Sequence, residues 1–127
     1  MAYDEELAER VRELVERATE GPRATLSERK MFGGLSFLVN GNMAVAVSGR
    51  GGLLVRVGSD AVDQLLEREF VEPALMGGRE MSGWLYVTPA GAARASVLRE
   101  WVEHAVGYVC ELSPKRKWPK SRRSQPD

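Results

Sequence analysis

The stretch of sequence that decides the fold is Met31-Phe32-Gly33-Gly34-Leu35-Ser36-Phe37-Leu38-Val39-Asn40-Gly41-Asn42-Met43-Ala44-Val45-Ala46-Val47. Two runs of apolar, aromatic and β-branched residues are separated by Asn40-Gly41, and a glycine pair introduces the first run. This pattern is typical of a β-hairpin, because glycine and asparagine accept the positive φ angles of tight turns. The sequence therefore predicts two antiparallel strands here.

The register of this hairpin depends on which side chains share a face. A two-residue loop at Asn40-Gly41 would place Phe37 opposite Ala44. A three-residue loop over residues 40–42 gathers the large apolar side chains on one face. We therefore expect the three-residue loop, with the core pairs Val39–Met43, Phe37–Val45 and Leu35–Val47.

A third strand is predicted after the turn at residues 49–52. In it, Leu53, Val55 and Val57 have the spacing that continues the core face. The opposite face of the three strands would hold a small and only half-apolar set, namely Ser36, Leu38, Ala44, Ala46, Leu54 and Arg56. Such a surface suits either solvent or a binding partner.

The flanking segments predict a helix, a connection and a second helix. Residues 4–19 carry apolar residues at helical spacing, with Asp4 as the N-cap, and residues 22–30 have no sustained period and read as a connection. Gly58-Ser59-Asp60 marks the start of a short helix that ends near Arg68 and covers the sheet.

The remaining elements are a further strand pair and a long helix. Residues 70–83 look like a brief strand and a glycine-rich loop, in which Pro73 favours a sheet edge. Residues 84–88 form the last strand, and a helix over residues 92–112 presents one broad apolar stripe: Val97, Leu98, Trp101, Val102, Ala105, Tyr108, Val109 and Leu112.

This order predicts an α+β fold, a two-layer α-β(3)-α-β(2)-α domain with an antiparallel sheet and the helices on one face. We expect the domain to cover residues 1–112 and a basic, disordered tail to cover residues 113–127. The length of 127 residues fits one core, and 43% hydrophobic with 28% charged residues is ordinary for a globular protein.

Composition also limits the compartment and the partners. No apolar run approaches a membrane span, the start is acidic, and Cys110 is the single cysteine, so we expect a cytoplasmic protein without a membrane partner. Residues 1–112 hold 12 basic and 17 acidic residues, whereas residues 113–127 hold 6 and 1. A nucleic-acid role would therefore use the tail.

That tail carries the candidate nucleic-acid residues. Its basic side chains could contact phosphates while its tryptophan stacks on a base; the alternative, which we favour, is a solubilising tail. The residues concerned are Lys115, Arg116, Lys117, Trp118, Lys120, Arg122 and Arg123.

Few residues offer catalytic or metal chemistry. His104 and Cys110 are six residues apart on one predicted helix, about 240° around its axis, so they do not face one site. One histidine and one cysteine do not build the usual zinc site. We therefore expect no catalytic residues, no cofactor and no metal.

Two glycine pairs, Gly33-Gly34 and Gly77-Gly78, invite comparison with phosphate loops, but both lead into predicted strands rather than helices, which favours turn geometry. If the two loops are neighbours, their apolar and basic residues form one interaction patch. The alternative, which we favour, is that Met31, Phe32 and Trp84 are core and Arg79 is a surface charge. The candidate patch is Lys30, Met31, Phe32, Gly33, Gly34, Arg79, Met81, Gly83 and Trp84.

The segment from Arg29 to Gly34, continuing into Phe37 and Asn40-Gly41-Asn42-Met43, resembles the N-terminal domain of the TfoX/Sxy family. Three later pieces fall in the family's order, namely Leu54-Val55-Arg56-Val57, the run from Met76 to Val87 and a closing helix with Trp101. The resemblance covers roughly residues 3–112 and implies the same α-β(3)-α-β(2)-α domain.

The resemblance also implies a link to bacterial regulators of natural competence, which act with a cyclic-AMP receptor-type transcription factor. Full-length regulators carry a second, helical domain where this chain has its basic tail. We expect a non-catalytic module that binds a protein, such as a transcription factor or a polymerase component, or a second copy of itself. The alternative is a small-ligand or nucleic-acid binding protein that uses the glycine loops or the tail.

Overall fold

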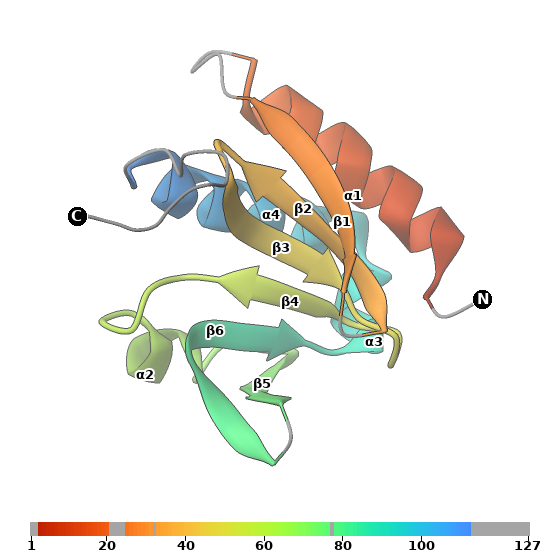
Figure 1. Cartoon of the computed structure of the whole chain (residues 1–127). Helices are drawn as coiled ribbons and strands as arrows, with labels where there is room; N and C mark the ends of the chain where they lie inside the picture. The colour runs from red at the N-terminus through yellow and green to blue at the C-terminus, as the bar shows by residue number, and fades with distance from the viewer. Residues whose placement is uncertain (1–2, 21–24, 32, 77, 113–127) are drawn as a thin grey trace.

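The computed structural model describes residues 3–20, 25–31, 33–76 and 78–112 of the chain (Figure 1). In these ranges the six strands form one antiparallel sheet in the order β1-β2-β3-β4-β6-β5. The elements in chain order are α1 (Glu5–Ala18), β1 (Leu26–Met31), β2 (Gly34–Val39), β3 (Asn42–Val47), β4 (Leu53–Arg56), α2 (Val62–Leu65), β5 (Val71–Met76), β6 (Arg79–Val87), α3 (Pro89–Ala92) and α4 (Ala95–Cys110).

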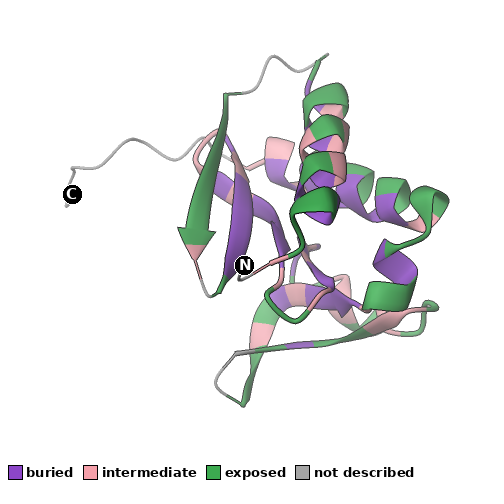
Figure 2. Ribbon diagram, turned by 90° about the vertical axis from the view of Figure 1, so that its right-hand side faces the viewer, coloured by how far each residue is buried: buried purple, intermediate pink, exposed green. Residues whose placement is uncertain are grey.

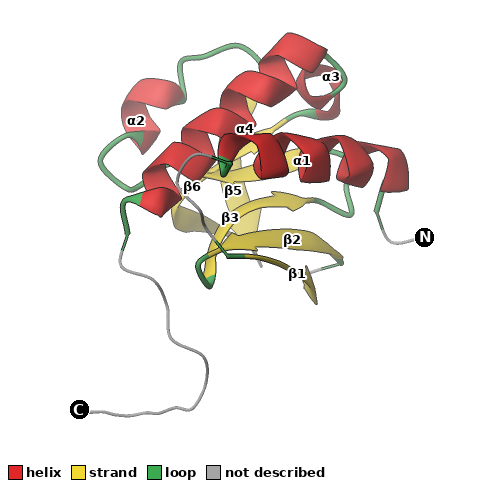
Figure 3. Cartoon of the chain, turned by 90° about the horizontal axis from the view of Figure 1, so that it is seen from above, coloured by secondary structure: helices red, strands yellow, loops and turns green. Residues whose placement is uncertain are grey.

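The helices lie on one side of the sheet, as the view from above shows (Figure 3). Helix α4 packs against α1 and against β3 and β4 at the middle of the sheet. This arrangement confirms the predicted α+β class with helices on one face.

The buried residues lie where the helix layer and the sheet face each other (Figure 2). Helix α1 begins as predicted, because the Asp4 carboxylate accepts hydrogen bonds from the backbone N–H groups of Glu6 and Leu7. The predicted C-terminal helix over residues 92–112 is present as α4, and the short helix α3, which the sequence did not predict, precedes it. Val106, which the predicted stripe omitted, is only 2% exposed.

The segment over residues 22–30 was predicted wrongly as a connection, because Leu26–Met31 forms strand β1. This strand lies at the edge of the sheet and pairs with β2 along its whole length. Its side chains from Leu26 to Lys30 are exposed. Backbone hydrogen bonds hold such an edge strand without apolar alternation, so the sequence lacks the usual strand pattern.

The turn of the central hairpin also differs from the prediction. Asn40 and Gly41 have φ angles of 53° and 82°, which fit a two-residue type I′ turn, and Val39 pairs with Asn42. The register then shifts between Phe37 and its neighbour Leu38. The three-residue loop was therefore wrong.

The register shift restores the expected pairs Phe37–Val45 and Leu35–Val47. It also moves Ala44 into the core, where it is fully buried, and pairs Met43 with Leu38. Two expectations were therefore wrong: Met43, expected in the core, lies on the opposite face, and Ala44, expected on that face, lies in the core.

The last two strands form an edge of the sheet. Strand β5 is the edge strand, as Pro73 indicated. Strand β6 begins at Arg79 rather than at residue 84, so the glycine-rich loop is shorter than predicted. Helix α2 is shorter than predicted, but Val62, Leu65 and the following Leu66 pack against the core, as expected.

Candidate interaction face

The sheet has a second face, turned away from the described helices (Figure 3), which we call the open face. Strand alternation assigns side chains to it, because core residues such as Leu35, Leu53 and Leu85 point the other way. Its central side chains are Arg29, Met31, Ser36, Leu38, Met43, Ala46, Leu54, Arg56, Trp84 and Tyr86.

One row of paired residues crosses the entire open face. The row is Arg29–Ser36–Ala46–Leu54–Tyr86–Glu72, one residue from each strand in sheet order. Directly paired residues of antiparallel strands project on the same side of the sheet, so these side chains are neighbours. The row therefore runs from a cation through small and apolar groups to an anion.

The middle of the row consists of small or apolar side chains that are largely buried. Ser36 and Ala46 are 0% and 4% exposed, while Leu54 beside them is half-buried. Leu38 and Met43 are half-buried as well, next to the bulge. Aliphatic surface thus remains accessible to solvent on a face that no described helix covers.

Ser36 has a further feature. Its hydroxyl oxygen is buried and finds no hydrogen-bond partner among the described residues. A buried hydroxyl without a partner lowers stability, so such groups are uncommon in folded proteins.

Three arginines border the apolar part of the open face. Arg29 is exposed on β1, and the Arg56 guanidinium donates a hydrogen bond to the Met43 carbonyl oxygen at 3.3 Å. The Arg50 guanidinium lies 5.0 Å from the centre of the Tyr86 ring. Across the part of the chain that the structure describes, none of the three forms an ion pair with a carboxylate.

The first half of the patch predicted from sequence lies around the β1–β2 turn. Lys30 is exposed and points to the helix side of the sheet, whereas Met31 is half-buried on the open face. Phe32 lies outside the described residues. Gly33 is exposed with φ 75°, and a Cβ on Gly34 would lie 2.0 Å from the Val47 carbonyl oxygen.

The second half lies around the β5–β6 turn. Arg79 is exposed where β6 begins, and Met81 and Trp84 are half-buried. Gly83 is buried with φ 83° and its backbone lies against Gly58. Trp84 pairs with Arg56, which places it on the open face.

The structure does not bring the two halves together, so the condition under which they would form one patch is not met. The β1–β2 turn lies at one edge of the sheet and the β5–β6 turn at the other, with β3 and β4 between them (Figure 1). The two turns also lie at opposite ends of the strands. Val87, where β6 ends, pairs with Leu53, and Leu53 pairs with Val47, which lies against Gly34 at the β1–β2 turn. The β5–β6 turn is at the other end of β6, where that strand begins. Met31 and Trp84 are the members that share the open face.

Both glycine turns join antiparallel strands, which fits the turn interpretation. Gly33 and Gly78 have φ angles of 75° and 83°, and a Cβ at either would meet nothing within 4 Å. These two positions therefore need glycine for their backbone angle, whereas Gly34 needs it for space.

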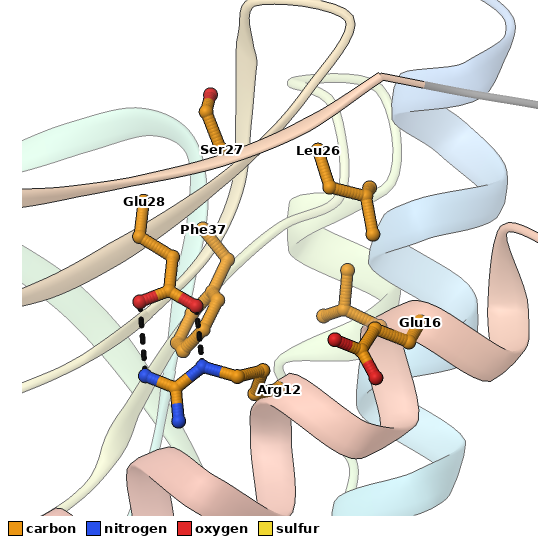
Figure 4. Close-up of a pocket in the computed structure, with 7 residues that line it drawn as sticks. Arg12, Glu16, Leu26, Ser27, Glu28 and Phe37 are labelled. Atoms are coloured by element: carbon orange, nitrogen blue, oxygen red, sulfur yellow. Dashed lines mark hydrogen bonds and ion pairs between the residues drawn. The ribbon is translucent and has the colours of Figure 1, made fainter.

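A pocket of about 170 Å³ lies between α1 and β1, with Arg12, Glu28 and Phe37 in its wall (Figure 4). The Arg12 guanidinium grips the Glu28 carboxylate at two points, one of them Nη2 to Oε1 at 2.9 Å, and lies 5.8 Å from the Phe37 ring centre. Hydrogen bonding to Arg12 lowers the pKa of Glu28, and the same contact raises the pKa of Arg12. This contact fastens the edge strand to the helix.

A second hollow, of about 250 Å³, lies between α2 and the β5–β6 pair. Met81, Gly83 and Trp84 line it together with the acidic residues Asp63 and Glu80. Part of the predicted patch therefore borders acidic groups rather than Lys30.

The residues considered for catalysis lie apart from these features. His104 is exposed, 6.0 Å from the Trp101 ring, and burial raises the pKa of the half-buried Cys110 thiol. Within residues 3–112, gaps excepted, no three His, Cys, Asp or Glu side chains are grouped as metal ligands would be. Across the same ranges no helix is long and apolar enough to span a membrane.

Comparison with known families gives one match. The model of the TfoX N-terminal domain matches residues 21–108, from the approach to β1 into the last part of α4. No curated protein and no solved structure matches the chain. The candidate tail residues 115–123 lie outside both the match and the described residues.

Proposed function

Because the chain belongs to the TfoX N-terminal domain family, a family of non-catalytic, competence-related regulatory modules, we propose that it acts by binding a protein on its open face. The partner is a transcription factor or a polymerase component, in keeping with the regulatory character of the family. The tail and the glycine turns are not needed for this contact.

The observation that carries the proposal is the accessible apolar surface on the open face. Leu38, Met43 and Leu54 stay half-buried on a face that no described helix covers, with arginines around them. Aliphatic and methionine side chains bordered by arginine are typical of the centre of a protein interface.

The edges of the sheet are less suited to a partner than its face. Strand β1 carries consecutive charges at residues 28–30, and β5 contains Pro73 next to an irregularity in its pairing. Charges, proline and bulges are the usual protection of edge strands against added strands. We therefore propose that the partner contacts the side chains of the open face rather than adding a strand to an edge of the sheet.

The test compares two leucines that differ in the face they occupy. Leu54→Ser removes apolar surface from the open face, and Leu26→Ser makes the same change on the helix side of β1, where Leu26 is 37% exposed. Each variant and the wild type are used to capture proteins from the native cell. We expect transcription proteins to be enriched by the wild type and Leu26→Ser and lost with Leu54→Ser.

Thermal unfolding of both variants controls for damage to the fold. Equal enrichment by all three proteins would contradict the proposal, because the open face would then not be the contact.

A further inference from the structure

The charges of the open face are not balanced within the described chain. Arg12 in α1 and Arg68, which lies against Trp101 of α4, are paired with Glu28 and Glu100. Arg29, Arg50 and Arg56 have no such partner there. The single carboxylate in the row across the open face is Glu72, at its β5 end.

Unpaired guanidinium groups next to apolar surface favour a ligand that brings carboxylates. Arginine binds a carboxylate through two parallel hydrogen bonds, which makes it selective for such groups. Arg29 stands at one end of the row, Arg56 lies beside its middle and Arg50 covers Tyr86 near the other end. The three cations are thus spread along the apolar strip rather than collected at one point.

The row also has a defined length. From Arg29 on β1 to Tyr86 on β6 it crosses four strand spacings, which is about 19 Å at roughly 4.8 Å each. An extended peptide advances about 3.3 Å per residue, so about six residues cover this distance.

The accessible groups fit a peptide better than a nucleic acid. Single strands bind by stacking bases on exposed aromatic rings, but Tyr86 is only 6% exposed beneath Arg50 and Trp84 is half-buried. The accessible apolar groups are mainly aliphatic, at Leu38 and Leu54.

We infer that the open face binds an extended protein segment of about six residues in which every second residue faces the sheet and these sheet-facing residues include both Asp or Glu and apolar residues. This inference rests on the proposed function and names the chemistry of its partner. The carboxylates of the segment pair with Arg29 and Arg56, and its apolar side chains cover Leu38, Met43 and Leu54.

The test uses defined probes with the full chain. A fluorescein-labelled peptide in which Asp and Leu take turns at every second position, with Ser between them, is compared with the same peptide carrying Lys in place of Asp and with a labelled single-stranded thymidine oligonucleotide, by fluorescence anisotropy. We expect the acidic peptide to bind at least about tenfold more tightly than either other probe and to weaken as salt is raised. Amide NMR shifts on binding should centre on Ala46 and Leu54.

Charge variants locate the contact. Arg29→Gln and Arg56→Gln together should weaken the acidic peptide about tenfold or more, whereas Arg99→Gln, an exposed arginine on α4, should leave binding unchanged. Arg56 also bonds to the backbone of β3, so Arg29→Gln alone serves as a variant without that structural role. It should weaken binding by at least about threefold.

The outcomes separate this inference from the proposed function. Equal binding of the acidic and basic peptides, or unchanged binding by the arginine variants, overturns the acidic partner but leaves capture that depends on Leu54 intact. Binding of the oligonucleotide but not of the acidic peptide, when the oligonucleotide is lost with Arg29→Gln and Arg56→Gln together, overturns both, because the open face would then serve a nucleic acid.

Discussion

The two faces of the sheet differ most clearly at Leu53 and Leu54, which are adjacent on β4. Leu53 is fully buried against the helices, whereas Leu54 points to the open face and is half-buried. Because side chains alternate along a strand, successive residues of β4 face opposite sides of the sheet. One face stabilises the fold, and the other is free to carry an interaction.

The same division extends to charge. On the helix side, Arg12 fastens β1 to α1 through Glu28. On the open side, Arg29 of the same strand has no ion pair with any residue that the structure describes. The adjacent residues Glu28 and Arg29 thus differ: Glu28 forms an ion pair within the fold, whereas Arg29 remains available to a partner on the open face.

The largest expected effect comes from replacing each of these two leucines by alanine. Leu53→Ala should lower the free energy of unfolding by about 3 kcal/mol, because it leaves a cavity in the core. Leu54→Ala should lower it by about 1 kcal/mol, since solvent already reaches that side chain. Urea unfolding measures both. Equal losses would mean that the open face is as closely packed as the core.

The next effect compares the two glycines of the β1–β2 turn, one limited by space and the other by its backbone angle. A Cβ on Gly34 would lie 2.0 Å from the Val47 carbonyl oxygen, so Gly34→Ala should cost about 2 kcal/mol or more. Gly33→Ala meets nothing within 4 Å and should cost about 1 kcal/mol for its positive φ. Unfolding curves of the two single variants make the comparison, and a larger loss at Gly33 would contradict it.

The sequence carried the information for the elements that bury one face. The helical spacing of α1 with its Asp4 cap, and the alternation of Leu53 with Val55, directly reflect contact with the core. Most of the open face was likewise predictable, because Ser36 and Leu54 alternate with core residues.

Three features could not be predicted by the same reasoning. Strand β1 is exposed, so no burial pattern marks it. The sizes of the hairpin side chains favour a three-residue loop, whereas the positive φ angles of Asn40 and Gly41 fit a two-residue turn and a bulge places the small Ala44 in the core. The separation of the glycine turns depends on strand order, which local sequence does not encode.

A smaller effect of opposite sign is expected at Ser36. Its buried hydroxyl lacks a partner among the described residues, so Ser36→Ala should raise the free energy of unfolding by about 1 kcal/mol. Ser48 is the matched control, because its hydroxyl accepts a hydrogen bond from the Arg50 N–H, and Ser48→Ala should lower stability slightly. Thermal unfolding compares them. A loss at Ser36 would show that its hydroxyl is bonded in the folded protein.

The smallest effect concerns the ion pair that holds β1 to α1. Arg12 lowers the pKa of Glu28 in the folded protein, so the charged carboxylate stabilises the fold above the ordinary pKa of glutamate. That contribution disappears as the pH falls through the lowered pKa. Both side chains are about one-third exposed, so Glu28→Gln should cost under about 1 kcal/mol near neutral pH.

The pH dependence distinguishes this ion pair from a general loss of packing. The stability difference between wild type and Glu28→Gln, followed by urea unfolding, should shrink as the pH falls below the ordinary glutamate range, because the wild-type carboxyl then also loses its charge. Glu9→Gln is the control, since Glu9 contacts the same arginine at 2.9 Å but its side chain is 75% exposed, and its effect should be smaller. A difference that stays constant with pH would show that Glu28 holds β1 by packing rather than by charge.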